Sequence, residues 1–183
     1  MNSAAKPETD LGAVFDAHIA AEFTDPSLDA TMATMTDAPV LTHVPVLTGG
    51  NGREAVRAFY GKYFIGRWPA DTRIVRVSRT MGQDRLVDEL IVSFTHDIEM
   101  PALLPGVQPT GRRVELPHVV VVGFSCGKVS FERIYWDQAS LLVQIGLLDS
   151  AGLPVTGVEQ ARRVLDPGQP SNALIERAER SRV

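Results

Sequence analysis

Cysteine is almost absent from this chain of 183 residues, which contains only Cys126. A single cysteine excludes a disulfide within the chain and indicates a reducing compartment, so we expect a cytoplasmic protein. Long apolar runs are absent too, because the longest, residues 119–124, is far shorter than the ~20 residues that span a bilayer. Residues 1–10 have no apolar core, so we expect no signal peptide and no membrane partner.

An excess of positive charge is also missing. The 18 Lys and Arg residues are outnumbered by 22 Asp and Glu residues, which gives a formal net charge of -4. Nucleic-acid binding usually needs a basic surface, and the arginines here are spread along the chain, so we expect no nucleic-acid partner. The hydrophobic share of 44% is ordinary for a soluble globular protein with one core.

The chain length favours one domain with an extension. We expect a loose N-terminus at 1–8, a domain at 9–148, and a C-terminal extension at 149–183 that packs on the domain or on a partner subunit. Helical signals precede strand signals along the domain. This order predicts an α+β fold with an antiparallel sheet, because short connections do not support parallel pairing.

Periodicity locates the elements. Apolar residues at helical spacing predict three helices, whose expected N-caps are Thr9 or Asp10, Asp25 and Asn51. Alternating, β-branched segments predict the strands. The expected strands are 40–47, 72–80, 85–100, 114–124 and 129–137.

Residues 127–148 form a strand that passes directly into an apolar helix. Strand residues alternate faces, so Arg133, Tyr135 and Asp137 share one face, and Glu132 and Trp136 share the other. At the strand end, Asp137 is either a helix N-cap or an acid/base group in a half-dry pocket.

A hairpin register brings a histidine to this strand. If 125–128 closes a two-residue hairpin, His118 lies opposite Tyr135 and on the same face. His118, Tyr135, Arg133 and Asp137 would then converge. A slip of one residue would instead turn His118 to the other face.

Residues 123–127, GFSCG, match the G-x-S-x-G pattern of a nucleophile elbow. The elbow requires a helix after the serine and a histidine later in the chain. A strand is predicted here, and all four histidines precede Ser125, so we interpret the segment as a hairpin turn. Cys126, without an adjacent histidine, is more often inert than reactive.

A metal site can be drawn from His96, Asp97 and His118. Neighbouring strand residues face opposite sides, so His96 and Asp97 cannot easily bind one ion. We therefore expect no metal and no cofactor.

The first half of the chain offers another histidine and several aromatic residues. His43 precedes a turn, where a lone histidine is usually structural or exposed. Tyr60, Tyr63 and Trp68 either belong to a plain core or form the wall of a pocket between the helices and a curved sheet.

Three segments resemble one known family: residues 43–60, 109–116 and 127–148. The last is the most specific, because its G-K-V start, its Asp137 and its L-L-V-Q-I-G end resemble the family's closing motif. Residues 11–148 are thus similar to the SnoaL-like polyketide cyclase group of the nuclear-transport-factor-2-like superfamily. The resemblance implies a cone-shaped fold, with a curved antiparallel sheet wrapped around N-terminal helices.

The resemblance also implies a site. In these cyclases an aspartate near the end of the final strand is the general acid/base, and histidines line the pocket. The positions that match are Asp137 and His43, and His118 joins them through the register argument alone. The implied catalytic residues are Asp137, His118 and His43, and the implied substrate contacts are Tyr135, Arg133, Tyr60, Trp68 and Tyr63.

We therefore expect a cofactor-independent enzyme that performs acid/base chemistry on a small or medium hydrophobic carbonyl compound. Two alternatives stay open. One is a non-catalytic ligand-binding or dimerisation module of the same fold. The other is a hydrolase of lactones or epoxides, for which epoxides would need two carboxylates around a water. We also expect a homodimer.

Overall fold

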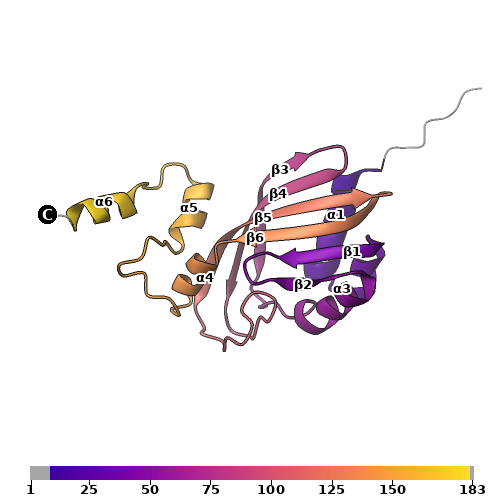
Figure 1. Ribbon diagram of the computed structural model, residues 1–183, viewed down its shortest axis with the longest axis horizontal. Coiled ribbons are helices and arrows are strands. Elements are labelled where there is room, and N and C mark those ends of the chain that lie inside the picture. Colours follow the sequence, from indigo (N-terminus) through magenta and orange to yellow (C-terminus); the bar gives the residue numbers. More distant parts are fainter. Residues whose placement is uncertain (1–8, 182–183) are drawn as a thin grey trace, which may run out of the picture.

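The computed structural model describes residues 9–181, so the predicted loose terminus at 1–8 lies outside the described residues. Helices and strands combine in an α+β arrangement (Figure 1), which confirms the predicted fold class. The helical elements are α1 (Leu11–Ile19), η1 (Ala20–Thr24), α2 (Leu28–Ala33), α3 (Arg53–Phe59), η2 (Tyr60–Phe64), α4 (Gln138–Gln144), α5 (Glu159–Leu165) and α6 (Ala173–Arg180). The strands are β1 (Met35–His43), β2 (Thr48–Asn51), β3 (Arg73–Met81), β4 (Arg85–Thr95), β5 (Arg113–Ser125) and β6 (Lys128–Trp136).

One six-stranded sheet, in the order β2-β1-β6-β5-β4-β3, forms the body of the molecule. Neighbouring strands are antiparallel except for β1 and β6, which run parallel. This pair corrects the prediction of a wholly antiparallel sheet. Short connections exclude parallel pairing only between consecutive strands, whereas β1 and β6 lie at opposite ends of the domain sequence.

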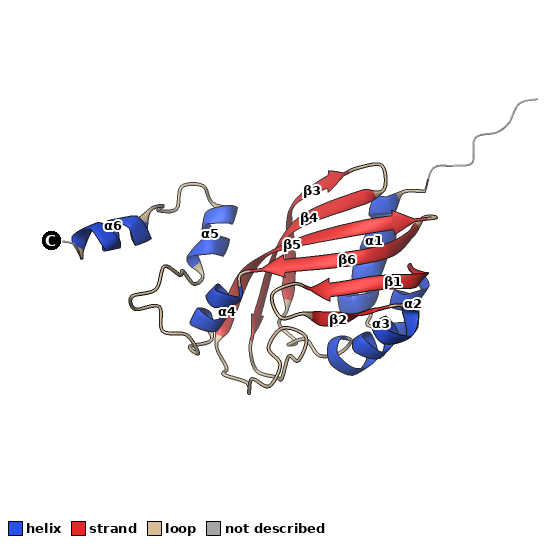
Figure 2. Cartoon of the chain, in the orientation of Figure 1, coloured by secondary structure: helices blue, strands red, loops and turns tan. Residues whose placement is uncertain are grey.

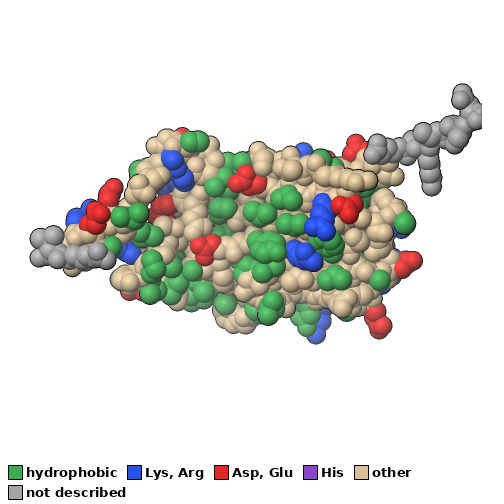
Figure 3. All heavy atoms as spheres, turned by 45° about the horizontal axis from the view of Figure 1, so that its top comes forward, with side chains coloured by type: hydrophobic (Ala, Val, Ile, Leu, Met, Phe, Trp, Pro, Cys, Tyr) green, Lys and Arg blue, Asp and Glu red, His purple; other side chains and the backbone are tan. Residues whose placement is uncertain are grey.

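Helices α1, α2 and α3 cover one face of the sheet, here called the inner face (Figure 2). Strand β5 shows the alternation that results: Val114, Leu116 and Val120 are buried, whereas Val119 is 40% exposed on the outer face. The hydrophobic core therefore lies between the inner face and the helices. Hydrophobic side chains also gather on the molecular surface drawn in Figure 3.

The helix starts differ from the predicted ones at two of three positions. Asp10 caps α1 by accepting an N–H of the first turn at 3.0 Å, as predicted. Ser27, rather than Asp25, caps α2. Gly52, rather than Asn51, precedes α3, with a φ of 85° that favours glycine. Within residues 9–181, no helix is long and apolar enough to cross a membrane.

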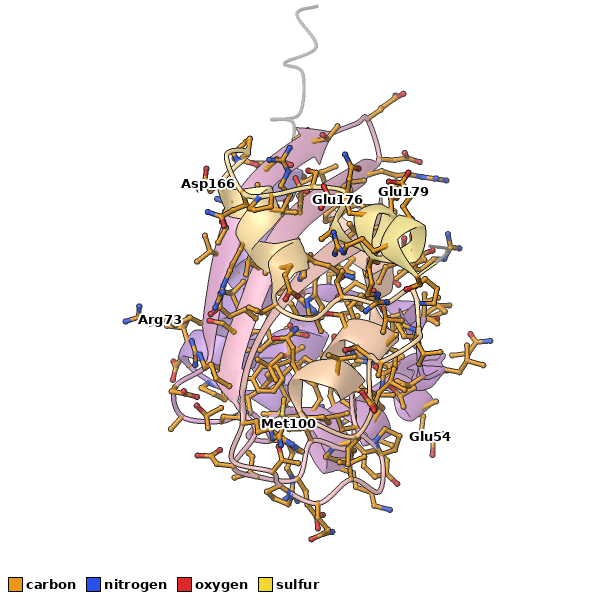
Figure 4. The ribbon with its side chains drawn as sticks, turned by 90° about the vertical axis from the view of Figure 1, so that its left-hand side faces the viewer. Glu54, Arg73, Met100, Asp166, Glu176 and Glu179 are labelled. Atoms are coloured by element: carbon orange, nitrogen blue, oxygen red, sulfur yellow. The ribbon has the colours of Figure 1, made fainter. Side chains whose placement is uncertain are left out.

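The loop between β4 and β5 and helix α4 close one end of the sheet. Met100, Ala102, Leu103 and Leu104 of this loop are all buried. Figure 4 views this end, with Met100 below α4. The loop therefore covers this end of the core and places Leu103 in the interior.

The C-terminal extension leaves the domain beyond α4. Helix α5 lies against β5, and its Ala161 is fully buried. The Ser140 hydroxyl of α4 donates to the carbonyl of Gly157 at 2.8 Å. Helix α6 carries no buried residue and projects from the body (Figure 1).

Candidate functional site

A chamber of about 50 Å³ lies between the inner face of the sheet and the N-terminal helices. At ~10–15 Å³ per water molecule, this volume corresponds to roughly three to five waters. Its lining is mostly apolar. Five aromatic residues line it: Phe23, Tyr60, Phe64, Trp68 and Trp136. The ionisable lining residues apart from Tyr60 are Glu22, His43, His118 and Glu132.

Two π-helical turns direct side chains into this chamber. Helix α1 continues into η1, which carries Glu22 and Phe23, and α3 continues into η2, which carries Tyr60 and Phe64. All four residues line the chamber. Because π-turns occur frequently at functional sites, their presence on both helices agrees with a site here.

Three charged side chains form a buried cluster at the chamber wall. His18 is fully buried, and Glu22 and Glu132 are 4% and 3% exposed. His18 Nε2 lies 2.7 Å from Glu132 Oε1 and 3.2 Å from Glu22 Oε1. The Tyr60 hydroxyl lies 3.3 Å from the same nitrogen. Glu132 Oε1 makes no aligned hydrogen bond within residues 9–181, so its contact with His18 is an ion pair.

Thr34 determines which nitrogen of His18 faces the carboxylates. The Thr34 hydroxyl donates its single proton to the carbonyl of Thr31 at 2.7 Å. Its oxygen therefore accepts the Nδ1–H of His18, at 2.6 Å. The nitrogen left to exchange protons with Glu22 and Glu132 is Nε2.

In this cluster the positive charge of His18 compensates the negative charges of Glu22 and Glu132. Burial alone would lower the pKa of His18, but the charges of Glu132 and Glu22 outweigh it and raise that pKa to about 10. Burial raises the pKa of Glu22 against the opposing charge of His18. Burial and the same two carboxylates raise the pKa of the Tyr60 hydroxyl, which therefore stays protonated.

The same three side chains could in principle hold a metal ion. Their ligand atoms, one each from His18, Glu22 and Glu132, lie within 4.8 Å of one another. A metal would need a deprotonated Nε2, and a His18 pKa of about 10 keeps that nitrogen protonated at neutral pH. The three side chains compensate one another as an imidazolium between two carboxylates.

His43 and His118 lie on the sheet side of the chamber. They are 3% and 4% exposed, and their rings lie 5.7 and 5.5 Å from that of Trp136. Burial, with the nearby His118, lowers the pKa of His43 to about 3. Burial lowers the pKa of His118 to about 4. Both imidazoles are therefore neutral at physiological pH.

A larger cleft of about 600 Å³ adjoins the chamber. It is lined by η1 and β3 and by polar residues that include Asp16, Arg76 and Arg79. Glu22 and Trp68 line both cavities. Of the two carboxylates in the cluster, Glu22 is therefore the one that lines both the chamber and the cleft.

The predicted hairpin is present, but its register is wrong by one residue. Ser125 pairs with Lys128 as predicted, yet a bulge follows, and His118 pairs with Trp136 instead of Tyr135. The ring of Phe131 occupies the space that a side chain at position 123 would need, which explains the glycine there. His118 therefore faces the chamber.

Arg133 and Tyr135 lie on the outer face of the sheet, away from the chamber. Both are exposed, and the guanidinium of Arg133 stacks 4.5 Å from the ring centre of Phe131. The predicted convergence of Arg133 and Tyr135 with His118 is thus corrected. The bulge places these residues on opposite faces.

Asp137 lies at the strand end and lines neither cavity. Its carboxylate caps α4 by accepting the Ser140 N–H at 3.1 Å, and it accepts the side-chain amide of Gln160 at 2.5 Å. The first contact is the helix cap, and the second ties the strand end to α5. A catalytic role for Asp137 stays a prediction.

The predicted aromatic residues separate in space. Tyr60 and Trp68 line the chamber, whereas Tyr63 is 38% exposed outside it.

Sequence reasoning did not select His18, Glu22 and Glu132. The signal for the first two was their spacing of four residues, which places both on one face of a predicted helix.

No protein-family model matches the chain, and no curated protein matches it. Several solved structures do. AclR from Streptomyces galilaeus, a proposed hydroxylase, is 24% identical with a TM-score of 0.58, over 76% of this chain and 87% of its own. A proposed SnoaL-like polyketide cyclase from Jannaschia is 19% identical with a TM-score of 0.60, over 81% and 100%. A protein of ketosteroid isomerase-like fold from Catenulispora acidiphila, in complex with trimethylamine, is 14% identical with a TM-score of 0.56, over 79% and 96%.

These similarities confirm the nuclear-transport-factor-2-like fold that the sequence resemblance predicted. They also include a structure from the SnoaL-like group. At such low identity they show the fold alone. The chemistry has to be argued from the residues of this chain.

Proposed function

We propose that the protein is a cofactor-independent enzyme that transfers protons on a small hydrophobic carbonyl compound, with Glu22 as the acid/base. The observation that carries this proposal is the buried cluster of Glu22, His18 and Glu132 beside an otherwise apolar chamber. A carboxyl whose pKa is raised by burial suits proton transfer near neutral pH.

Each member of the cluster has a separate role. Ionised Glu22 takes a proton from the carbon next to the substrate carbonyl, and the Tyr60 hydroxyl donates a hydrogen bond to the oxygen that becomes an enolate. His18 makes no part of the chamber lining; as an imidazolium it compensates both carboxylates from behind. Glu132 balances His18, so that Glu22 is free to exchange its proton.

The chamber walls support a hydrophobic substrate. Aromatic rings from Phe23, Trp68 and Trp136 surround the space. Exclusion of water strengthens each electrostatic contact within it. One of the similar structures is named as a proposed SnoaL-like polyketide cyclase, and a substrate of that kind would carry carbonyl groups.

The test is exchange of solvent deuterium at the carbon next to a carbonyl, followed by NMR on 2-butanone, cyclohexanone and 4-hydroxy-2-butanone. The wild type should exceed the buffer rate for at least one ketone. Glu22→Gln should lower that rate by ~10²–10⁴-fold. The matched control is Glu54→Gln, at an exposed glutamate of α3 that points into solvent (Figure 4). Equal rates in wild type and Glu22→Gln would contradict the proposal.

Hydrolysis of small epoxides is a second candidate, favoured by the pairing of Glu22 with Glu132 across His18. Two carboxylates beside a space of water size can activate a water and protonate the opening ring oxygen. Incubation with propylene oxide, which suits the small chamber, in ¹⁸O-labelled water would test it. Labelled diol without ketone exchange would select this candidate.

A second copy of the chain is the macromolecular partner that we propose. The outer face of the sheet exposes Val75, Val119 and Tyr135 by 49%, 40% and 41%. Val119 and Tyr135 pair directly on strands β5 and β6, and Val75 lies on the edge strand β3, so the exposed apolar side chains suit an interface between two sheets. Light scattering should give the mass of two chains, and Val119→Lys should reduce it to one. A wild-type mass of one chain would contradict the pairing.

A further inference from the structure

Two histidines in the chamber each keep one ring nitrogen without a partner. Thr48 donates its hydroxyl proton to the carbonyl of Ala102 at 2.7 Å, so its oxygen accepts the Nδ1–H of His43 at 3.1 Å. His118 donates its Nδ1–H to the carbonyl of Leu116 at 3.0 Å. A neutral imidazole has one N–H, so Nε2 of each ring is an acceptor.

Neither Nε2 atom accepts a hydrogen bond from the described residues, 9–181. Neither Nε2 atom is among the fully buried polar atoms that lack a hydrogen-bond partner, and both rings line the chamber. Each atom is therefore accessible from the chamber. A buried acceptor without a donor loses the hydrogen bond that it would have in water. The chamber therefore presents two nitrogen lone pairs that only its contents can satisfy.

We infer that the chamber selects carbonyl compounds that also carry a hydroxyl group, and that this hydroxyl donates to Nε2 of His118 or His43. The inference rests on the proposed function, because it names the substrate class of the same site. The carbonyl oxygen is held by Tyr60 on the helix side. The hydroxyl binds on the sheet side, where both histidines contact Trp136.

The charges around the chamber favour a neutral donor. A carboxylate in the ligand would meet Glu22 and Glu132. An ammonium would lose its hydration among the apolar walls of the chamber. A hydroxyl supplies the missing hydrogen bond without adding a charge.

The histidines are acceptors and not bases in this assignment. Their low pKa values, about 3 and about 4, mean that a substrate hydroxyl keeps its proton while donating it. Proton transfer stays with Glu22. His43 and His118 are thus residues that determine specificity.

The experiment compares 4-hydroxy-2-butanone with 2-pentanone, in which a methyl group replaces the hydroxyl. Dissociation constants for the whole chain are measured by NMR titration of the protein, without turnover. The hydroxyketone should bind about 10-fold more tightly or better, because 2-pentanone leaves an acceptor unpaired. Equal affinities, as expected if the chamber takes only water or any apolar molecule, would overturn the inference.

Variants assign the effect to the histidines. His118→Phe and His43→Phe keep an aromatic ring but remove the acceptor, so at least one should abolish the preference. His96→Phe is the matched control, since His96 is fully buried but lines neither the chamber nor the cleft. A preference that survives both chamber variants would overturn the assignment, and the wild-type comparison stands if a variant does not fold.

The outcome is separable from the proposed function. Ketone exchange that depends on Glu22 but shows no preference for the hydroxyketone would overturn only this inference. Preferential binding without exchange would overturn only the proposed function.

Discussion

Two carboxylates that are close in the sequence lie in opposite surroundings. Asp137 directly follows β6 in a half-buried position, where the Ser140 N–H and the Gln160 amide satisfy it. Glu132, within β6, is buried against His18 and Glu22. At the strand end, neutral donors stabilise the charge locally. Inside the cluster, the Glu132 carboxylate depends on the His18 imidazolium as its counter-charge.

The difference shows why a carboxylate at a strand end need not be the reactive one. Asp137 has its carboxylate oxygens occupied by the first turn of α4 and by Gln160. Burial raises the pKa of Glu22, which lines the chamber. The two regions should therefore respond differently to substitution and to pH.

The largest effect on stability is expected from His18→Gln. The change leaves Glu132 and Glu22 buried without their counter-charge, so the free energy of unfolding should fall by about 3–5 kcal/mol. Denaturant unfolding at pH 7 checks it. A loss below about 1 kcal/mol would show that the cluster is no more important than a surface pair.

Thr34→Val should have the next largest effect. It removes the oxygen that accepts the Nδ1–H of His18 and leaves that N–H buried and unpaired, which costs about 1–3 kcal/mol. Thr34→Ser, which retains the hydroxyl, is the control and should stay near wild type. Equal losses in both variants would refute the positioning role.

The pH dependence of stability separates the histidines. The pKa of His18 rises from 6.5 to about 10, so its contribution is complete below pH 6.5 and is lost as the pH rises toward 10. Glu22, Glu132 and Tyr60 face it, and the raised pKa values of Glu22 and Tyr60 act in the same direction.

His43 and His118 act in the opposite direction. Their pKa values fall to about 3 and about 4, so the unfolded chain binds protons that the folded one does not, and stability falls as the pH drops below 6.5. Each group contributes a slope of up to about 1.4 kcal/mol per pH unit. Unfolding measured from pH 4 to 10 should show a maximum near 6.5. His18→Gln should flatten only the alkaline side, and an unchanged alkaline slope would refute the assignment.

The smallest effect is expected at the strand end. Asp137→Ala removes the α4 cap and should cost about 1 kcal/mol, whereas Asp137→Asn retains a capping oxygen and should cost less. Loss of the Gln160 contact should also make α5 more sensitive to limited proteolysis. If Asp137→Ala lowered the free energy of unfolding by more than His18→Gln does, the strand end and not the buried cluster would contribute more to stability.

Local periodicity predicted much of the fold. Alternation along 114–124 and 129–137 located β5 and β6 closely, and Asp10 was identified as the cap of α1. The parallel pairing of β1 with β6 was not predictable in this way, because it joins segments far apart in the sequence. The π-turns of η1 and η2 also have no marker in the apolar spacing.

The site was harder to predict because one bulge decides which residues meet. Ser125 and Lys128 close the hairpin as expected, but the register shift after Phe124 pairs His118 with Trp136. Because side chains along a strand alternate between the two faces, a shift of one residue exchanges the faces on which they lie. His18 and Glu22 reach Glu132 only through tertiary packing, which no local pattern records.

The most direct test compares the two carboxylates in one assay. Deuterium exchange into the most reactive ketone should be measured side by side for wild type, Glu22→Gln and Asp137→Asn at matched protein stability. The account predicts that Glu22→Gln loses ~10²–10⁴-fold while Asp137→Asn keeps most of the wild-type rate. A large loss in Asp137→Asn, with Glu22→Gln unaffected, would contradict it and return the proton-transfer role to the strand end.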